Sequence, residues 1–207
     1  MADYQKEISG DLENLKFKQQ KNFKDFELFT SKKHEKYPEM YTHWETTYGF
    51  IFSVQMKIEQ GLSILVEELN KEDLNSYFDY LKLSSSEKEK LLEKLEVDKQ
   101  SAIDEIRKID KDVQYALASE KWTEANNYYI NNLLYFSDDV SKACSVIRDN
   151  LLEYLRLLRL NDLRGTELND LQSFESNYKQ QMFEEILPNN RISLRTEMQK
   201  ELRIGNT

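Results

Sequence analysis

Residues 37–69 read YPEMYTHWETTYGFIFSVQMKIEQGLSILVEEL, and this stretch decides the fold. Apolar or aromatic side chains recur every seven residues, and a second series follows four positions after the first. The two series are Tyr37, Trp44, Ile51, Ile58 and Leu65, and then Tyr41, Tyr48, Gln55, Leu62 and Leu69. A sustained spacing of 3.5 residues is typical of a helix that pairs lengthwise with another helix. The pattern therefore predicts a paired helix ~48 Å long.

The rest of the chain has the same character, because only five glycines and two prolines interrupt 207 residues. Such a chain has few places to turn, so its helices are expected to be long and to pack side by side. Hydrophobic residues make up 39% of the chain, which is too rich for a disordered protein even with 32% charged residues. We predict an all-α fold, an elongated bundle of long antiparallel helices with coiled-coil-like packing, formed by residues 1–207 as one domain.

Five helical segments are predicted within this domain. They are an N-terminal helix at 1–36, the heptad helix at 37–69, a short helix plus a second heptad helix at 72–118, a long straight helix at 120–160, and a C-terminal helical hairpin at 166–205. Pro38 predicts either a new helix or a kink in a longer one, since proline suits a first helical turn. The two heptad segments are expected to pack lengthwise, with Gly49 and Gly61 permitting a close approach.

Other boundaries rest on capping and turn residues. Ser84 with Glu87 predicts a capped helix start. Trp122, Val140 and Leu158 are each 18 residues apart, which is five helical turns, and this spacing favours one straight helix through 120–160. Ser137 and the two acids after it nevertheless allow a local break there. Pro188 with two asparagines after it predicts the turn of the hairpin.

Charge is uneven along the chain. Residues 61–120 carry 9 basic and 15 acidic side chains, while seven of the eight arginines lie at or beyond position 148. Arginine forms planar, bidentate contacts with carboxylates and phosphates, so this region holds the candidate partner-binding residues. They are Arg156, Arg159, Arg164, Arg191 and Arg195. The alternative is that these arginines pair within the chain, with Glu153, Asp162, Glu184 and Glu197.

Two short segments resemble a known group. Lys32 to Tyr41 reads KKHEKYPEMY, and Tyr135 to Val140 reads YFSDDV. Both are similar to segments of a loose group of uncharacterised bacterial helical proteins, in which a basic run precedes Tyr-Pro-Glu-Leu-Tyr. Met40 stands here in place of the leucine, and His34 in place of an arginine. The resemblance implies helices and a bacterial origin, and it implies no activity or site.

Residues for catalysis or for metal binding are scarce. The two histidines, His34 and His43, lie in no His-Glu-x-x-His motif and have no glutamate three residues earlier, as helical di-iron sites require. Helical nucleases of the HEPN type resemble the chain in size, but they need an arginine four to six residues before a histidine. The single Cys144 is expected to be a buried thiol. We therefore expect no enzyme activity, cofactor or metal.

The expected function is protein association. No apolar run approaches the ~20 residues of a membrane span, and the N-terminus is too charged for a signal peptide, so a cytoplasmic protein without membrane contact is expected. We expect a scaffold or accessory subunit of a bacterial assembly, with another protein or a second copy as partner. One alternative is a nucleic-acid-linked role of the arginines in a defence or toxin–antitoxin system, although net charge −9 disfavours duplex DNA. Another is an acidic inhibitor of a basic partner.

Overall fold

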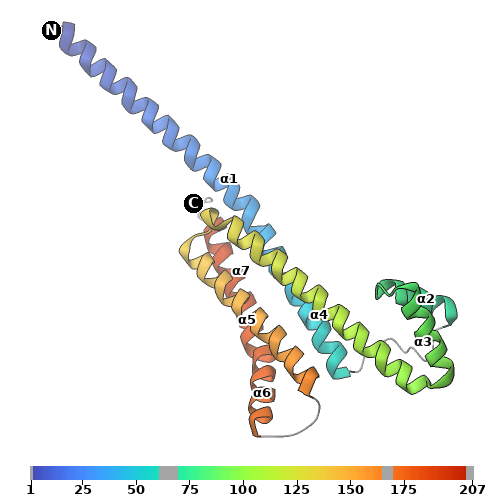
Figure 1. Ribbon diagram of the computed structural model, residues 1–207. Coiled ribbons are helices and arrows are strands. Elements are labelled where there is room, and N and C mark those ends of the chain that lie inside the picture. The colour runs from blue at the N-terminus through green and yellow to red at the C-terminus, as the bar shows by residue number, and fades with distance from the viewer. Residues whose placement is uncertain (1, 61–69, 165–169, 204–207) are drawn as a thin grey trace.

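The computed structural model describes residues 2–60, 70–164 and 170–203, and all regular structure in these ranges is helical. In chain order the elements are α1 (Ala2–Gln60), α2 (Lys71–Tyr80), α3 (Ser85–Val97), α4 (Lys99–Asn131), a 3-10 turn (Leu133–Tyr135), α5 (Asp138–Arg164), α6 (Asp170–Gln181), a π-helical turn (Met182–Ile186) and α7 (Leu187–Arg203). The all-α prediction is confirmed. Figure 1 shows an elongated molecule in which α1 extends well beyond the other helices.

The main core lies between the second half of α1 and the helices α4, α5 and α7. Thr47 of α1 donates its hydroxyl to the Lys121 carbonyl of α4 at 3.0 Å, and Trp122 of α4 donates its indole N–H to the Arg148 carbonyl of α5 at 3.0 Å. Large side chains that are fully buried here include Trp44, Ile51, Ile147, Leu151, Tyr154 and Met182. The core thus joins segments from both ends of the chain.

A second, smaller core forms a lobe at the N-terminal end of α4. Phe78 of α2 and Leu81, which caps the end of that helix, pack there with Leu91 of α3 and with Ile103 and Ile106 of α4. The predicted helix start at Ser84 is confirmed, because Ser84 and Glu87 form a reciprocal capping box. This lobe also changes the predicted pairing of the heptad segments, since the first turns of α4 contact α2 and α3 and only later turns contact α1.

Of the two alternatives at Pro38, the new helix with a boundary between 36 and 37 is wrong, because α1 runs as one longer helix through Pro38. A proline inside a helix costs about 3 kcal/mol through a lost hydrogen bond and a clash with the preceding turn. Pro38 lies on the exposed side of the helix, whereas Tyr37 and Met40 on either side of it are fully buried. Their burial offsets the cost and keeps both halves in one helix.

The single helix predicted at 120–160 is also wrong. The chain reverses direction after Asn131, and α5 begins after Ser137, whose hydroxyl accepts the Val140 N–H at 3.3 Å. The break that Ser137 allowed is therefore a complete reversal. The predicted second heptad helix is divided as well, because Asp98 ends α3 and caps α4 by accepting the Ser101 N–H at 3.2 Å.

The predicted C-terminal hairpin is wrong too, because the chain stays helical from Asp170 to Arg203 and makes no turn between two helices there. The proline in this region is accommodated by the π-helical turn, in which the Leu187 N–H donates to the Met182 carbonyl five residues earlier. This wider turn lies where the ring of Pro188 would meet the preceding carbonyls of a regular α-helix. Residues 165–169 lie outside the described residues, as do 61–69 with Gly61 and the end of the predicted heptad helix.

Candidate protein-interaction surface

The first half of α1 projects from the bundle as a single helix (Figure 1). Every residue from Leu12 to Phe29 is exposed, including seven large apolar side chains. These are Leu12, Leu15, Phe17, Phe23, Phe26, Leu28 and Phe29, with exposed fractions between 41% and 68%. Such a concentration of exposed phenylalanine and leucine is uncommon on a protein that acts alone.

Five of these side chains lie on one face of the helix. At about 100° per residue, the five fall within a sector of about 120°, and Phe17 and Leu28 fall on the opposite side. The five residues, here named the α1 stripe, are Leu12, Leu15, Phe23, Phe26 and Phe29. The stripe has the width that a helix normally buries against a partner.

The base of the projecting helix is fixed to the bundle by a cluster around Glu201 of α7. Its carboxylate accepts hydrogen bonds from Tyr37 at 2.7 Å and from Lys33 at 2.9 Å, both on α1, and from the Ser137 hydroxyl at the start of α5. Burial opposes ionisation of Glu201, but these three donors together hold the pKa of its carboxyl below the usual value. The cluster therefore sets the direction in which α1 leaves the bundle.

The stripe continues into a groove at this base. The ring of Phe29 lies 6.3 Å from that of Tyr135, measured between centroids, and Lys33 lies over the same Phe29 ring at 5.2 Å. A groove of about 610 Å³ opens between this part of α1 and the end of α7, where it is lined by Phe26, Phe29 and Leu202. Charged side chains such as Lys33 and Glu201 also line this groove, so the apolar stripe meets a mixed apolar and charged surface at the bundle.

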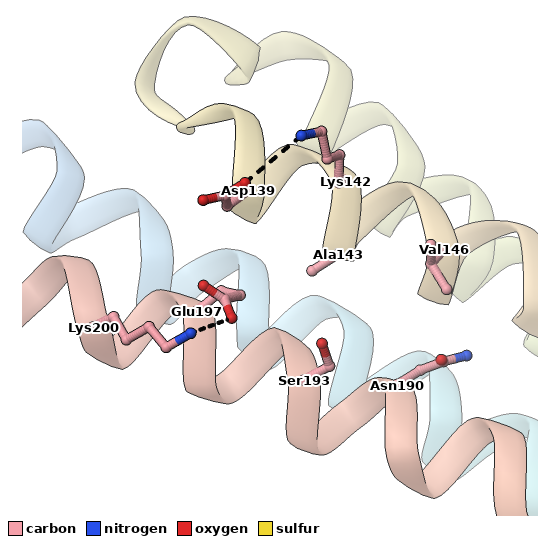
Figure 2. A pocket seen from close by; sticks show the side chains of 8 residues that line it. All are labelled: Asp139, Lys142, Ala143, Val146, Asn190, Ser193, Glu197 and Lys200. Atoms are coloured by element: carbon pink, nitrogen blue, oxygen red, sulfur yellow. Dashed lines mark hydrogen bonds and ion pairs between the residues drawn. The ribbon is translucent and has the colours of Figure 1, made fainter.

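A shallower depression of about 430 Å³ lies between α5 and α7. Figure 2 shows that its charged side chains form two ion pairs, each within one helix. Asp139 pairs with Lys142 at 3.7 Å, and Glu197 pairs with Lys200 at 2.6 Å. Because opposite charges are balanced and the rest of the lining is small, the depression presents no distinct chemistry for a ligand.

Two of the five predicted arginines, Arg191 and Arg159, lie beside neighbouring helices. Arg191 of α7 donates N–H groups from Nε and from one terminal nitrogen to the two Glu45 carboxylate oxygens of α1, with Nε–Oε1 at 2.8 Å. Its guanidinium carbon lies 4.2 Å from the centroid of the Tyr48 ring. Arg159 of α5 lies 6.0 Å from the centroid of the Tyr115 ring of α4. Arg191 therefore holds α7 to α1, while Arg159 borders α4.

The remaining three arginines belong to α5 and α7. Arg156 and Arg195 are exposed on α5 and α7, and Arg164 is the last residue of α5 with a side chain outside the described residues. Pairing of Arg191 within the chain does occur, but its partner is Glu45 and none of the four predicted acids. Glu197, one of those four, pairs instead with Lys200.

The titratable groups of the core are structural. Cys144 is fully buried, as predicted, and burial raises the pKa of its thiol to about 12, with the neighbouring Trp44 opposing the shift slightly. The half-buried His43 contacts Tyr128, with ring centroids 4.5 Å apart and the ring planes tilted by 33°. In the described ranges, no group of three His, Cys, Asp or Glu residues could hold a metal ion. None of the described helices is long and apolar enough to cross a membrane.

Sequence reasoning missed the stripe as a site, because it assigned residues 1–36 to an N-terminal helix and placed the candidate binding residues among the arginines. The feature that reveals the stripe is the difference in length between α1, with 59 residues, and α4, with 33, since the longer helix extends beyond its neighbour.

Comparison of the chain with protein-family models, with curated proteins and with solved structures finds no match.

Proposed function

We propose that this chain is a non-enzymatic protein-interaction subunit that binds its partner through the α1 stripe. The observation that carries the proposal is the projection of α1 with five large apolar side chains exposed on one face. A single amphipathic helix of this kind is a common recognition element, in which apolar anchors at helical spacing enter a groove or pair with another helix. Aromatic residues such as the three phenylalanines are frequent anchors at interfaces.

The firm base of the helix supports the same function. A helix held by Tyr37 and Lys33 at its exit from the bundle presents its apolar face in a fixed direction. Less conformational freedom is then lost on binding than for a disordered segment. The arginines support an interaction less well, because the guanidinium of Arg191 is already paired with the Glu45 carboxylate. A role of the arginines in nucleic-acid recognition stays a prediction.

Two matched double variants test the proposal. The stripe variant carries Leu15→Gln and Phe26→Gln, and the control variant carries Phe17→Gln and Leu28→Gln on the opposite face. Both remove one leucine and one phenylalanine, and glutamine is a good helix former. Burying the exposed half of such a side chain contributes roughly 1 kcal/mol, so the stripe variant is expected to bind its partner about 30-fold more weakly.

The measurement is quantitative capture of binding partners by each purified chain, with helix content and thermal midpoint recorded in parallel. Partners retained by the parent and the control variant, but lost by the stripe variant, support the proposal. Equal capture by all three chains, with the helix content unchanged, would show that the stripe is not the binding surface.

A further inference from the structure

We infer that the occupant of the α1 stripe is a second copy of this chain, paired antiparallel over residues 12–29. The inference rests on the proposed function, since it names the partner of the same surface. Its observations are the order of side chains along the exposed helix and the placement of two charges beside the stripe.

The seam of the pair follows from a heptad pattern that is itself exposed. Steps of three and four residues alternate along the projecting helix without a break through Leu12, Leu15, Gln19, Asn22, Phe26 and Phe29. All six side chains are exposed, so their spacing is not explained by packing within the chain. Alternation of three and four is the spacing that a two-helix seam requires.

The order of these six residues favours antiparallel pairing. When the second helix runs in the opposite direction, Leu12 lies opposite the partner's Phe29 and Leu15 lies opposite the partner's Phe26. Gln19 then lies opposite the partner's Asn22. Each apolar layer then contains one leucine and one phenylalanine, which keeps the distance between the two helices uniform. Parallel pairing would instead stack phenylalanine on phenylalanine at one end and leucine on leucine at the other. The central amides hydrogen-bond each other and define the register.

Charge at the edge of the seam points the same way. Lys18 and Asp25 are seven residues apart, so they occupy the same edge of the helix. In the antiparallel pair, Lys18 faces the partner's Asp25, and the symmetry of the dimer repeats this contact. In a parallel pair the residues facing them would be Phe23 and Thr30, which carry no charge. Opposite charges at such positions set the orientation more than the affinity.

The length of the paired segment is limited at both ends. Beyond Phe29 the same face of α1 turns into the bundle, where Lys33 and Tyr37 contact Glu201. Before Leu12 stands Gly10, a weak helix former, which marks where the partner chain can diverge from the bundle. The seam therefore spans about 27 Å, or 18 residues at 1.5 Å each.

A seam of this size predicts a reversible dimer, which sedimentation equilibrium of the full chain measures from about 1 to 300 µM. The parent and the control variant Phe17→Gln/Leu28→Gln are expected to dimerise within this range. The stripe variant Leu15→Gln/Phe26→Gln is expected to stay monomeric. A parent that stays monomeric throughout overturns the inference.

Charge reversal tests the orientation without relying on loss of packing. Lys18→Glu places two acids at each contact, and Asp25→Lys places two lysines there, so each single variant is expected to dimerise roughly tenfold more weakly than the parent. Mixing the two single variants pairs opposite charges at both contacts and is expected to restore parental affinity. Both substitutions lie on the exposed surface, and circular dichroism checks that each variant stays folded. Unchanged dimerisation of the single variants overturns the antiparallel register.

The outcomes separate the two proposals. If the parent is monomeric but the stripe variant still loses a captured protein, the second copy is wrong as the occupant and the proposed function stands. If the parent is monomeric and no captured protein depends on the stripe, both fail. A dimer that is unaffected by the stripe variant assigns self-association to another surface and also overturns the inference.

Discussion

Tyr37 donates its phenolic hydroxyl to the Glu201 carboxylate at 2.7 Å, and this bond joins the middle of the first helix to the end of the last. The same carboxylate accepts the Ser137 hydroxyl, which caps the start of α5. One acid therefore connects three helices at the base of the projecting helix. Its protonation is expected to affect both the stability of the bundle and the anchoring of α1.

Glu201→Gln is expected to destabilise the fold at neutral pH by about 1–2 kcal/mol, because a charged acceptor of three hydrogen bonds is replaced by a neutral one. The pKa of Glu201 in the fold lies below its usual value of 4.5, so its contribution is present above pH 4.5 and is lost as the pH falls through the lower value. Urea unfolding of parent and variant between neutral and acidic pH measures the difference, which should vanish in acid. A difference that is independent of pH would contradict this role of the ionised carboxylate.

Removal of the lysine that neutralises Asp110 is expected to be costly. Both Asp110 oxygens accept hydrogen bonds from Lys57 Nζ at 2.9 Å, and the acid is almost completely buried between α1 and α4. Lys57→Met leaves a buried charge unpaired, with an expected loss of about 3 kcal/mol in the free energy of unfolding. The double variant Lys57→Met/Asp110→Leu should recover most of that loss in chemical denaturation. A double variant less stable than Lys57→Met would show that Asp110 stabilises the fold through other contacts, such as that with Gln114.

Local signals in the sequence predicted local structure correctly. Ser84 and Glu87 satisfy each other three residues apart, so their cap depends on nothing distant. The reversal before Ser137 was missed because α4 and α5 both bury one face, and two amphipathic helices in succession can mimic one straight stripe. Pro38 was misjudged because its neighbours are buried by residues far along the chain.

The candidate site shows the same limit. Glu45, the partner of Arg191, lies 146 positions away, so no local pattern could identify the pair. The residues of the α1 stripe were recognisable as an amphipathic face, but whether such a face is covered depends on where the other helices end. Antiparallel packing of α1 and α4 is present, while the supercoiling expected from the heptads stays a prediction.

Gly49→Ala is expected to stabilise the protein by about 1 kcal/mol, because alanine is the better helix former in the interior of α1. A close helix approach at this glycine was predicted, and it is wrong: a Cβ added there would meet no atom within 4 Å. Thermal and urea unfolding measure the gain. A loss of stability would mean that a neighbouring helix does approach Gly49 in solution.

Modification of Cys144 is expected to report on opening of the bundle. The chain has one cysteine, its side chain is fully buried on α5, and burial raises the pKa of the thiol to about 12. At pH 8 only about one thiol in ten thousand would be ionised even with free access, and the thiolate is the reactive form. A disulfide reagent should therefore react with the native protein only as fast as the core opens, and within seconds in denaturant. The rate should rise in Lys57→Met by the factor by which the open population rises, roughly 150-fold for a loss of about 3 kcal/mol. Fast reaction of the native parent would show that α5 separates from the bundle without global unfolding.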